Sequence, residues 1–438
     1  MKFLSFAFGT TPRIRTSVLA LALVAAFELS GIAQQTIFRT GVEIIAVDVQ
    51  VMDKDGNPIS KIDPQAFEVS ITGRKHRVVS ATFIKHTDGP LPQQRRNPVP
   101  LASIFDDGSA ATLARTVILA VDNGSFEPGD TQAAMDAARK FLKYLDPTDL
   151  VGLYVFPSMM WIAPTTQRVP LDVRLANLVG EKQPLRSYYN LRPHEIVDVT
   201  AQSTNPNSFL TNVRNTGAVG GQQLNTVRAL DPVLKIQARE CAEDADCPIK
   251  IYSEGISLAT QLEREAQQSL SGLDSLLRVL GELPGRKSVV LVTGGLLVSD
   301  RLDGRPDPGP VARGMGQSAA RVNATIYTIH IDPGFANSLP ASRRGAGESN
   351  LSRDRAMLGN WLEDFSRVAG GRRIDVPVGG GEFAFDRVLR ETSAYYLLGV
   401  EPTEAMRDGL PHELKVKVDR RGVTVRNRQW VVIPRRRP

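Results

Sequence analysis

The sequence predicts an α/β protein: a doubly wound, mostly parallel sheet accompanied by a small β-sandwich-like domain formed from N-terminal and C-terminal strands. Two observations carry this prediction. The middle of the chain alternates continuous apolar runs, typical of strands buried on both faces, with segments of helical spacing. The two ends show the period-two alternation of strands with one buried face. Strand, helix and strand in succession favour parallel strands joined by crossover helices.

Length and composition narrow the classes of protein. The 438 residues exceed what one hydrophobic core serves, so two or three domains are expected. A share of 42% hydrophobic and 23% charged residues excludes collagen-like and wholly disordered chains. The formal net charge is +6, but no basic stretch is interleaved with aromatic residues that would stack on bases. We therefore expect solvated surface charge and no nucleic-acid partner.

The first residues have the features of an export signal. A segment with Lys2 and Arg15 is positively charged, and the apolar run 18–29 follows it. Small residues at Gly31 and Ala33 suit a signal peptidase, so cleavage is expected near Ala33. The alternative is a membrane anchor, for which the run is too short. The mature chain is expected to be secreted or periplasmic, without a transmembrane segment.

The N-terminal part of the expected mature chain predicts a small β unit. Apolar residues alternate over 42–51, and the turn formers of 53–58 end this run. Further strands are expected over 67–71 and 78–84. The polar, proline-rich stretch that follows, 88–100, is typical of a linker.

The central part predicts the parallel sheet and its helices. Strands are expected over 116–121, 150–156, 288–292, 325–331 and 374–376, with a hairpin strand near 159–163. Helices are expected over 131–145, 171–179, 256–280, 311–322, 355–368 and 383–392. The tail returns to strands over 395–400, 414–418, 423–425 and 430–433. Because both ends are rich in strands, the tail is expected to pack with or beside the N-terminal β unit.

The polar segment 185–250 interrupts the central pattern and is expected to be a partly disordered insertion loop. It contains the only cysteines, Cys241 and Cys247, which export would allow to form a disulfide. A metal site would need further Cys or His nearby, so a structural disulfide is favoured. The expected organisation is a signal peptide over 1–33, a β unit over 34–87, a linker over 88–111, an α/β domain over 112–394 with the insertion at 185–250, and a C-terminal β segment over 395–438.

Four stretches of the chain resemble, in order and spacing, a von Willebrand factor type A domain. They are Val117-Ile-Leu-Ala-Val-Asp122, Asp149-Leu-Val-Gly-Leu-Tyr-Val-Phe156, Gly285-Arg-Lys-Ser-Val-Val-Leu-Val-Thr-Gly-Gly295 and Asn323-Ala-Thr-Ile-Tyr-Thr-Ile329. The tail, Tyr395-Tyr-Leu-Leu-Gly-Val400 with Asp408-Gly409, is similar to an exported bacterial branch of the family that carries β segments on both sides. The resemblance implies a ligand site at the carboxyl ends of the parallel strands.

The resemblance also implies a metal-ion-dependent adhesion site. Its usual pattern is D-x-S-x-S after the first strand, a Thr in a second loop and an Asp in a third, whose oxygens suit Mg²⁺ or Ca²⁺. Asp122 fits the first position, but Gly124 and Phe126 occupy the two serine positions and Ser125 is out of register. Gly294 replaces the Asp of the third loop.

The site is therefore expected to be degenerate and without a cofactor. The remaining candidate metal ligands are Asp122 and either Thr165 or Thr166, which carry too little negative charge to dehydrate Mg²⁺. Asp122 has a structural alternative, accepting N–H groups of its own turn or capping the next helix. The candidate binding crevice consists of Asp122, Asn123, Gly124, Ser125, Thr165, Thr166, Thr293 and Gly294.

The expected function is a non-catalytic binding or scaffold module with a protein partner in the cell envelope or outside the cell. One alternative is a divalent-cation-dependent adhesion domain in which Glu127, Asp130 or Asp300 supplies substitute ligands. The other is a serine hydrolase centred on Ser125, with His330 as base, although the G-x-S-x-G elbow is absent.

Overall fold

The computed structural model describes residues 44–86, 115–201, 232–241, 243–302, 304–307, 309–332, 348–377 and 381–435. The expected signal peptide over 1–33 and linker over 88–111 lie outside these residues, as does 202–231 of the expected insertion. Within the described part of the chain, no helix combines the length and the apolar character that crossing a membrane requires.

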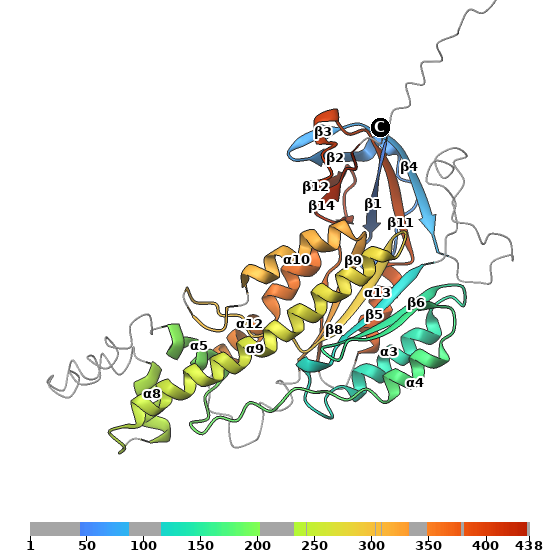
Figure 1. Ribbon diagram of the computed structural model, residues 1–438. Coiled ribbons are helices and arrows are strands. Elements are labelled where there is room, and N and C mark those ends of the chain that lie inside the picture. The colour runs from blue at the N-terminus through green and yellow to red at the C-terminus, as the bar shows by residue number, and fades with distance from the viewer. Residues whose placement is uncertain are drawn as a thin grey trace, which may run out of the picture. The chain divides into compact units, whose positions relative to one another are not determined.

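A six-stranded sheet with the order β10-β9-β8-β5-β6-β7 forms the centre of the α/β part (Figure 1). Its strands are β5 (Thr116–Asp122), β6 (Leu150–Phe156), β7 (Met160–Thr165), β8 (Lys287–Thr293), β9 (Ala324–Asp332) and β10 (Arg373–Pro377). Neighbours run parallel except β7, which returns antiparallel to β6 as a hairpin. The predicted mostly parallel α/β sheet is therefore confirmed.

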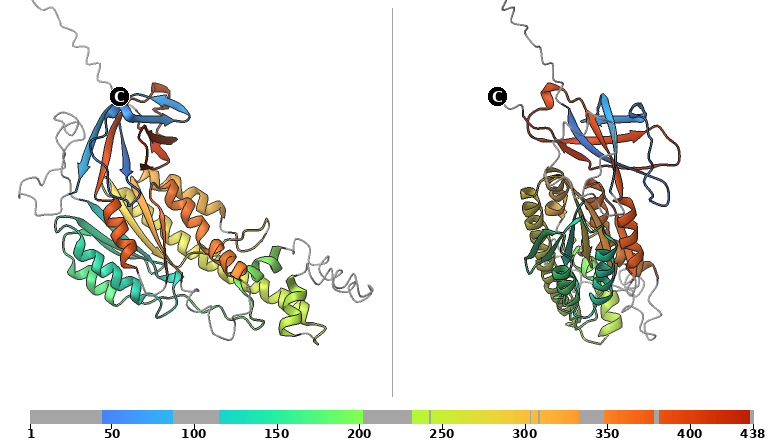
Figure 2. Two further views of the ribbon diagram at one scale, coloured as in Figure 1. Left: turned by 180° about the vertical axis from the view of Figure 1, so that it is seen from behind. Right: turned by 90° about the vertical axis from the view of Figure 1, so that its right-hand side faces the viewer.

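Helices cover both faces of this sheet, which explains why the central stretches of its inner strands, such as 117–121 and 289–292, are apolar. One face carries α3 (Gln132–Tyr144), α4 (Val169–Ala176) and α13 (Glu382–Glu391); the other carries α9 (Cys247–Glu282), α10 (Gly309–Arg321) and α12 (Glu348–Val368). Along β5, Leu119 points into the first core and Ile118 into the second. The layers on either side of the sheet can be followed in Figure 2.

The two ends of the described chain combine in two antiparallel four-stranded sheets, β13-β1-β11-β4 and β14-β12-β2-β3. The N-terminal strands are β1 (Ile45–Met52), β2 (Phe67–Ile71), β3 (Arg74–His76) and β4 (Val78–Lys85), and the C-terminal strands are β11 (Ala394–Val400), β12 (Pro411–Val418), β13 (Thr424–Arg426) and β14 (Trp430–Val432). β11 pairs with both β1 and β4, and β12 pairs with β2. One core between the sheets contains side chains from both ends of the chain, in agreement with the expected packing.

The expected insertion loop contains helices, which is a correction to the sequence-based prediction. The described part of 185–250 holds α5 (Pro193–Ala201) and α8 (Pro232–Glu240), and α9 begins at Cys247 rather than at residue 256. These helices share a small core of their own, with Ile196 and Val233 among its members. Their few apolar residues are enough to bury one stripe against the extended end of α9, although the segment as a whole is polar.

Candidate functional site

Asp122 and Gly294 meet at the carboxyl edge of the parallel sheet, as the expected crevice requires. Asp122 ends β5 and leads into the short turn η3 (Asn123–Ser125), while Gly294 follows directly after Thr293 at the end of the neighbouring β8. The N–H of Gly294 donates to the Ser125 Oγ at 2.7 Å, and the Thr293 hydroxyl donates to the Asp122 Oδ2 at 3.1 Å.

The carboxyl group of Asp122 is enclosed by hydroxyl groups. Its residue is only 2% exposed, and the Ser269 Oγ of α9 donates to its Oδ1 at 2.9 Å. Burial raises the pKa of Asp122 to about 7, because the charged form loses its hydration. Hydrogen bonds from Ser269 and Thr293 lower this pKa only in part.

These residues do not fit a divalent cation. Mg²⁺ and Ca²⁺ need several oxygen ligands that carry negative charge, whereas the Asp122 carboxyl is buried, takes hydroxyl donors on both oxygens and has a raised pKa. Over the described part of the chain, no group of three or more His, Cys, Asp or Glu is arranged to hold a metal ion. Asp300, one of the substitute ligands considered, instead accepts two hydrogen bonds from Arg353.

Close backbone contacts also seal the crevice. A Cβ atom at Gly294 would lie 2.6 Å from the backbone oxygen of Ser125, so the Asp that the family pattern places there has no room. From the other side, the N–H groups of Glu181 and Lys182 donate to the backbone oxygens of Asn123 and Phe126, each at 2.8 Å. The segment after α4 therefore covers η3.

Thr165 and Thr166 do not belong to this group, contrary to the prediction. Thr165 pairs with Val151 near the start of β6, whereas Asp122 pairs with Phe156 at its end. The hairpin carries the antiparallel β7 back along β6, so its last residue reaches the opposite edge of the sheet. The proposal of Thr166 as a metal ligand falls with it.

Ser125 lacks the contacts of a catalytic serine. Its Oγ donates to the backbone oxygen of Asp122 at 2.7 Å, and the residue is only 4% exposed. The Nδ1 of His330 lies 2.9 Å from the Asp375 carboxylate. Among the described residues no hydrogen bond joins Ser125 to His330, so the geometry gives the serine no general base.

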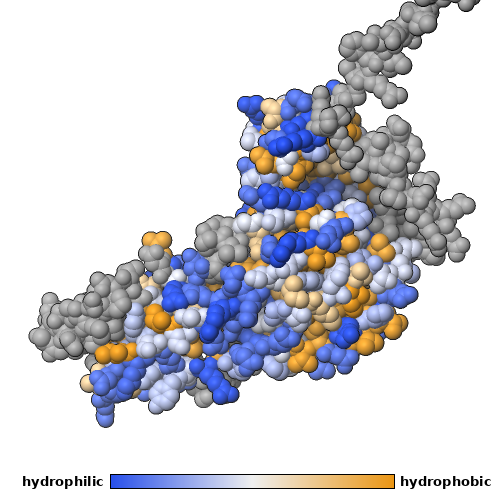
Figure 3. Space-filling model, viewed as in Figure 1, coloured by the Kyte–Doolittle hydropathy of each residue, from blue (hydrophilic) through white to orange (hydrophobic). Residues whose placement is uncertain are grey.

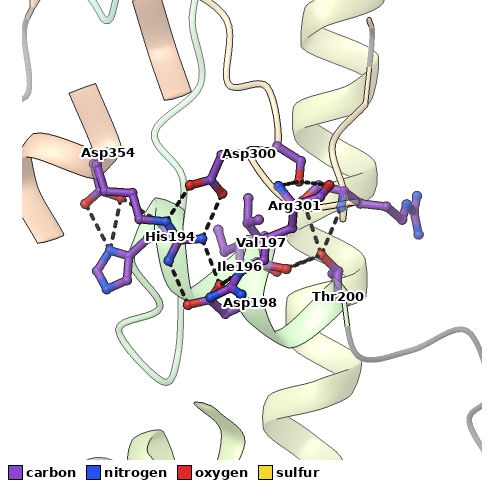
Figure 4. A network of polar contacts seen from close by, with 11 residues as sticks. His194, Ile196, Val197, Asp198, Thr200, Asp300, Arg301 and Asp354 are labelled. Carbon is purple, nitrogen blue, oxygen red and sulfur yellow. Dashed lines mark hydrogen bonds and ion pairs between the residues drawn. The ribbon is translucent and has the colours of Figure 1, made fainter. Parts of the chain in front are cut away.

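Two features of the site escaped the sequence analysis. Ser269 lies more than a hundred residues after Asp122 in an ordinary helical pattern, and only the path of α9 across the end of β5 brings the two together. A charged network is the second feature (Figure 4): Arg353 of α12 donates to Asp198 of α5 and to Asp300 after β8. Beside it, the ring of His194 contacts the Asp354 carboxylate at 3.0 and 3.1 Å.

The network positions the helical extension, which consists of α5, α8 and the N-terminal half of α9, over the carboxyl edge of the sheet. α5 packs on α9 and contacts α12, and the Arg301 side chain after β8 also donates to Asp198 at 2.8 Å. Positive side chains hold the pKa of Asp198 and Asp300 below the ordinary aspartate value, although burial opposes them. Both carboxylates are therefore ionised at neutral pH and tie α5 to the α/β part.

Comparison with known proteins adds no relative. Neither a family model nor a curated protein matches this chain. The likeness to the von Willebrand factor type A family remains the resemblance described from the sequence.

Proposed function

We propose that the chain is an exported, non-catalytic protein-binding or scaffold module that works without a divalent cation. The observation that carries this proposal is the sealed carboxyl edge, where Ser269 and Thr293 occupy both oxygens of Asp122. In open α/β sheets this edge is where ligands bind, so its closure moves any binding surface outward. The surface that then takes this place consists of α5, α8, the extended half of α9 and the segment leading to α5.

A calorimetric titration of the mature chain with Mg²⁺, Ca²⁺ and Mn²⁺ tests the cation-independent part of the proposal. No binding heat is expected at millimolar metal, and Asp122→Asn is expected to leave the thermogram unchanged. A saturable heat that disappears in Asp122→Asn would instead support a cation-dependent adhesion domain with substitute ligands.

Capture of a partner tests the binding role itself. The tethered mature chain is expected to retain a partner from the envelope extract of its own source, equally in EDTA and in Mg²⁺. A β-sandwich fragment has no defined fold without both chain ends, so the full mature chain is the material of choice. Failure to retain any partner under either condition would remove the support for a binding module.

A further inference from the structure

A polar groove of about 580 Å³ lies beside the sealed edge, between α9 and the segment that leads from α4 to α5. Its lining includes Gln183, Arg186, Gln261, Arg264, Glu265 and Gln268. The volume is in the range of clefts that take ligands, roughly 300 to 1,000 Å³. Figure 3 shows hydrophilic side chains along much of the middle of α9.

The groove is built by fixed backbone. At one end, the N–H groups of Glu181 and Lys182 hold the segment on η3. At the other, the N–H groups of Tyr188 and Tyr189 donate to the Glu254 carboxylate of α9 at 2.6 and 3.3 Å. The wall opposite α9 is therefore anchored on both sides of the groove, which reduces the ordering cost of binding.

The charges in the groove are unbalanced. Arg186 and Arg264 are exposed, and no carboxylate of the described residues lies within ion-pair distance of either. Among the described residues of the lining, the one acid is Glu265, which accepts a hydrogen bond from the Gln261 amide at 3.0 Å. Arg278 on the same helix differs, since it pairs with Asp274 at 3.2 Å.

We propose that this groove receives an extended acidic segment of a protein partner, with carboxylates bound by Arg186 and Arg264. The proposal rests on the binding role proposed above. An arginine fork holds a carboxylate by two parallel hydrogen bonds, and the Gln183 and Gln268 amides supply partners for a peptide backbone. Tyr188 adds a ring at the end of the groove that is 84% exposed and packs edge-on against Tyr189. Tyrosine and arginine dominate the energetics of protein interfaces.

A protein segment fits the groove better than nucleic acid does. Single strands are held by successive bases stacked on several aromatic rings, whereas the described residues that line the groove contribute no ring and Tyr188 at its end is a single one. The two arginines lie on different walls of the groove, Arg186 on the segment before α5 and Arg264 on α9. Side-chain carboxylates at intervals along an extended peptide complement this arrangement.

Fluorescence anisotropy of the mature chain with a short labelled peptide that alternates glutamate and glycine tests the proposal. We expect saturable, salt-sensitive binding that Arg186→Gln with Arg264→Gln weakens at least about tenfold. Arg278→Gln is the matched control and should leave the affinity unchanged. Because the two groove arginines are exposed and have no ion pair among the described residues, thermal unfolding should not change either.

Three results would overturn the groove proposal: equal binding of the glutamine counterpart of the peptide, unchanged binding by the double variant, or tighter binding of a single-stranded oligonucleotide. The outcome separates from that of the proposed function. If the double variant retains the captured partner as well as the unaltered chain does, the groove proposal fails and the binding role stands. If no partner is captured while the arginine-dependent peptide binding persists, the groove stands and the binding role loses its support.

Discussion

At the scale of single residues, Asp122 has a structural role at the edge of the sheet where the resemblance implied a metal ligand. The residue ends β5 where the family pattern would begin a metal site, yet two hydroxyl groups from distant segments satisfy its carboxyl. Burial favours the protonated acid, because this form keeps a polar group in the interior without a buried charge, although the two hydrogen bonds that the carboxyl accepts oppose the shift. The sequence predicted a degenerate metal site from its missing ligands, which stays a prediction, and it did not predict the hydrogen bonds from Ser269 and Thr293 to Asp122.

The pH dependence of stability should report the raised pKa of the buried Asp122 carboxyl. The pKa of Asp122 is about 7 in the folded protein and near 3.8 when unfolded. Between these values the folded state binds a proton that the unfolded state has released, so stability falls as pH rises through the window and the full cost is present above pH 7. In urea unfolding, Asp122→Asn should remove about 3 kcal/mol of the decline between about pH 5 and pH 8. Equal declines in both proteins would contradict the raised pKa.

Gly294 leads to a second prediction at this scale. Gly294→Asp introduces the residue that the von Willebrand factor type A pattern has here but places a Cβ 2.6 Å from the Ser125 backbone oxygen, so we expect the free energy of unfolding to fall by about 2 kcal/mol or more, with no gain of metal affinity. Gly314→Ala is the control, because a Cβ atom at this position meets nothing within 4 Å. The substitution also removes a glycine from the interior of α10. It should raise the free energy of unfolding by about 0.5 kcal/mol. A stable, metal-binding Gly294→Asp protein would refute the sealed site.

At the scale of elements, the predictions were right where the sequence pattern lay within one segment. They were wrong where the outcome depended on how the chain runs between distant segments. β2 and β6 follow the expected residues because their apolar runs and bounding turns lie within one segment. α5 and α8 were missed because their amphipathic stripes are short and meaningful only against the extended end of α9. The position of Thr165 was wrongly predicted for a related reason. The tight turn between β6 and β7 makes β7 antiparallel, so Thr165 reaches the opposite edge of the sheet.

The disulfide belongs to this helical extension. Cys241 follows α8 and Cys247 begins α9, with its side chain fully buried in the small core. Closing so short a loop stabilises by about 2 kcal/mol. In the double variant Cys241→Ala/Cys247→Ala, amide exchange should accelerate in α8 and the first turns of α9, while β5 and β8 keep their protection. Faster exchange in β5 as well would mean that the extension is part of the main folding unit.

At the scale of the whole molecule, buried charges connect the β-sandwich to the α/β part. Glu391 at the end of α13 is fully buried. Its carboxylate oxygens lie 2.6 Å from the Arg387 Nε, 3.5 Å from the Arg372 Nη1 and 3.7 Å from the Nη1 of Arg426 in β13. Nearby, the Arg286 guanidinium stacks on the Tyr395 ring at 4.2 Å and approaches Asp48 of β1 at 3.5 Å. Because β11 continues from α13 into the sandwich, these contacts join one continuous chain segment to strands from both ends.

This connection predicts that the two parts unfold together and that Glu391 couples them. The three tryptophans separate the signals, since Trp161 and Trp361 lie in the α/β part and Trp430 lies in β14. In a Trp161→Phe/Trp361→Phe background, fluorescence reports the sandwich while circular dichroism at helical wavelengths reports the α/β part, and the two transitions should coincide.

Glu391→Ala leaves three arginines around an empty position and should lower the free energy of unfolding by about 3 to 5 kcal/mol. The sandwich signal should then move to lower denaturant ahead of the helical one, because β13 loses its ion pair to Glu391 at the end of α13. Coincident transitions in the variant would show that the strand pairing of β11 alone carries the coupling.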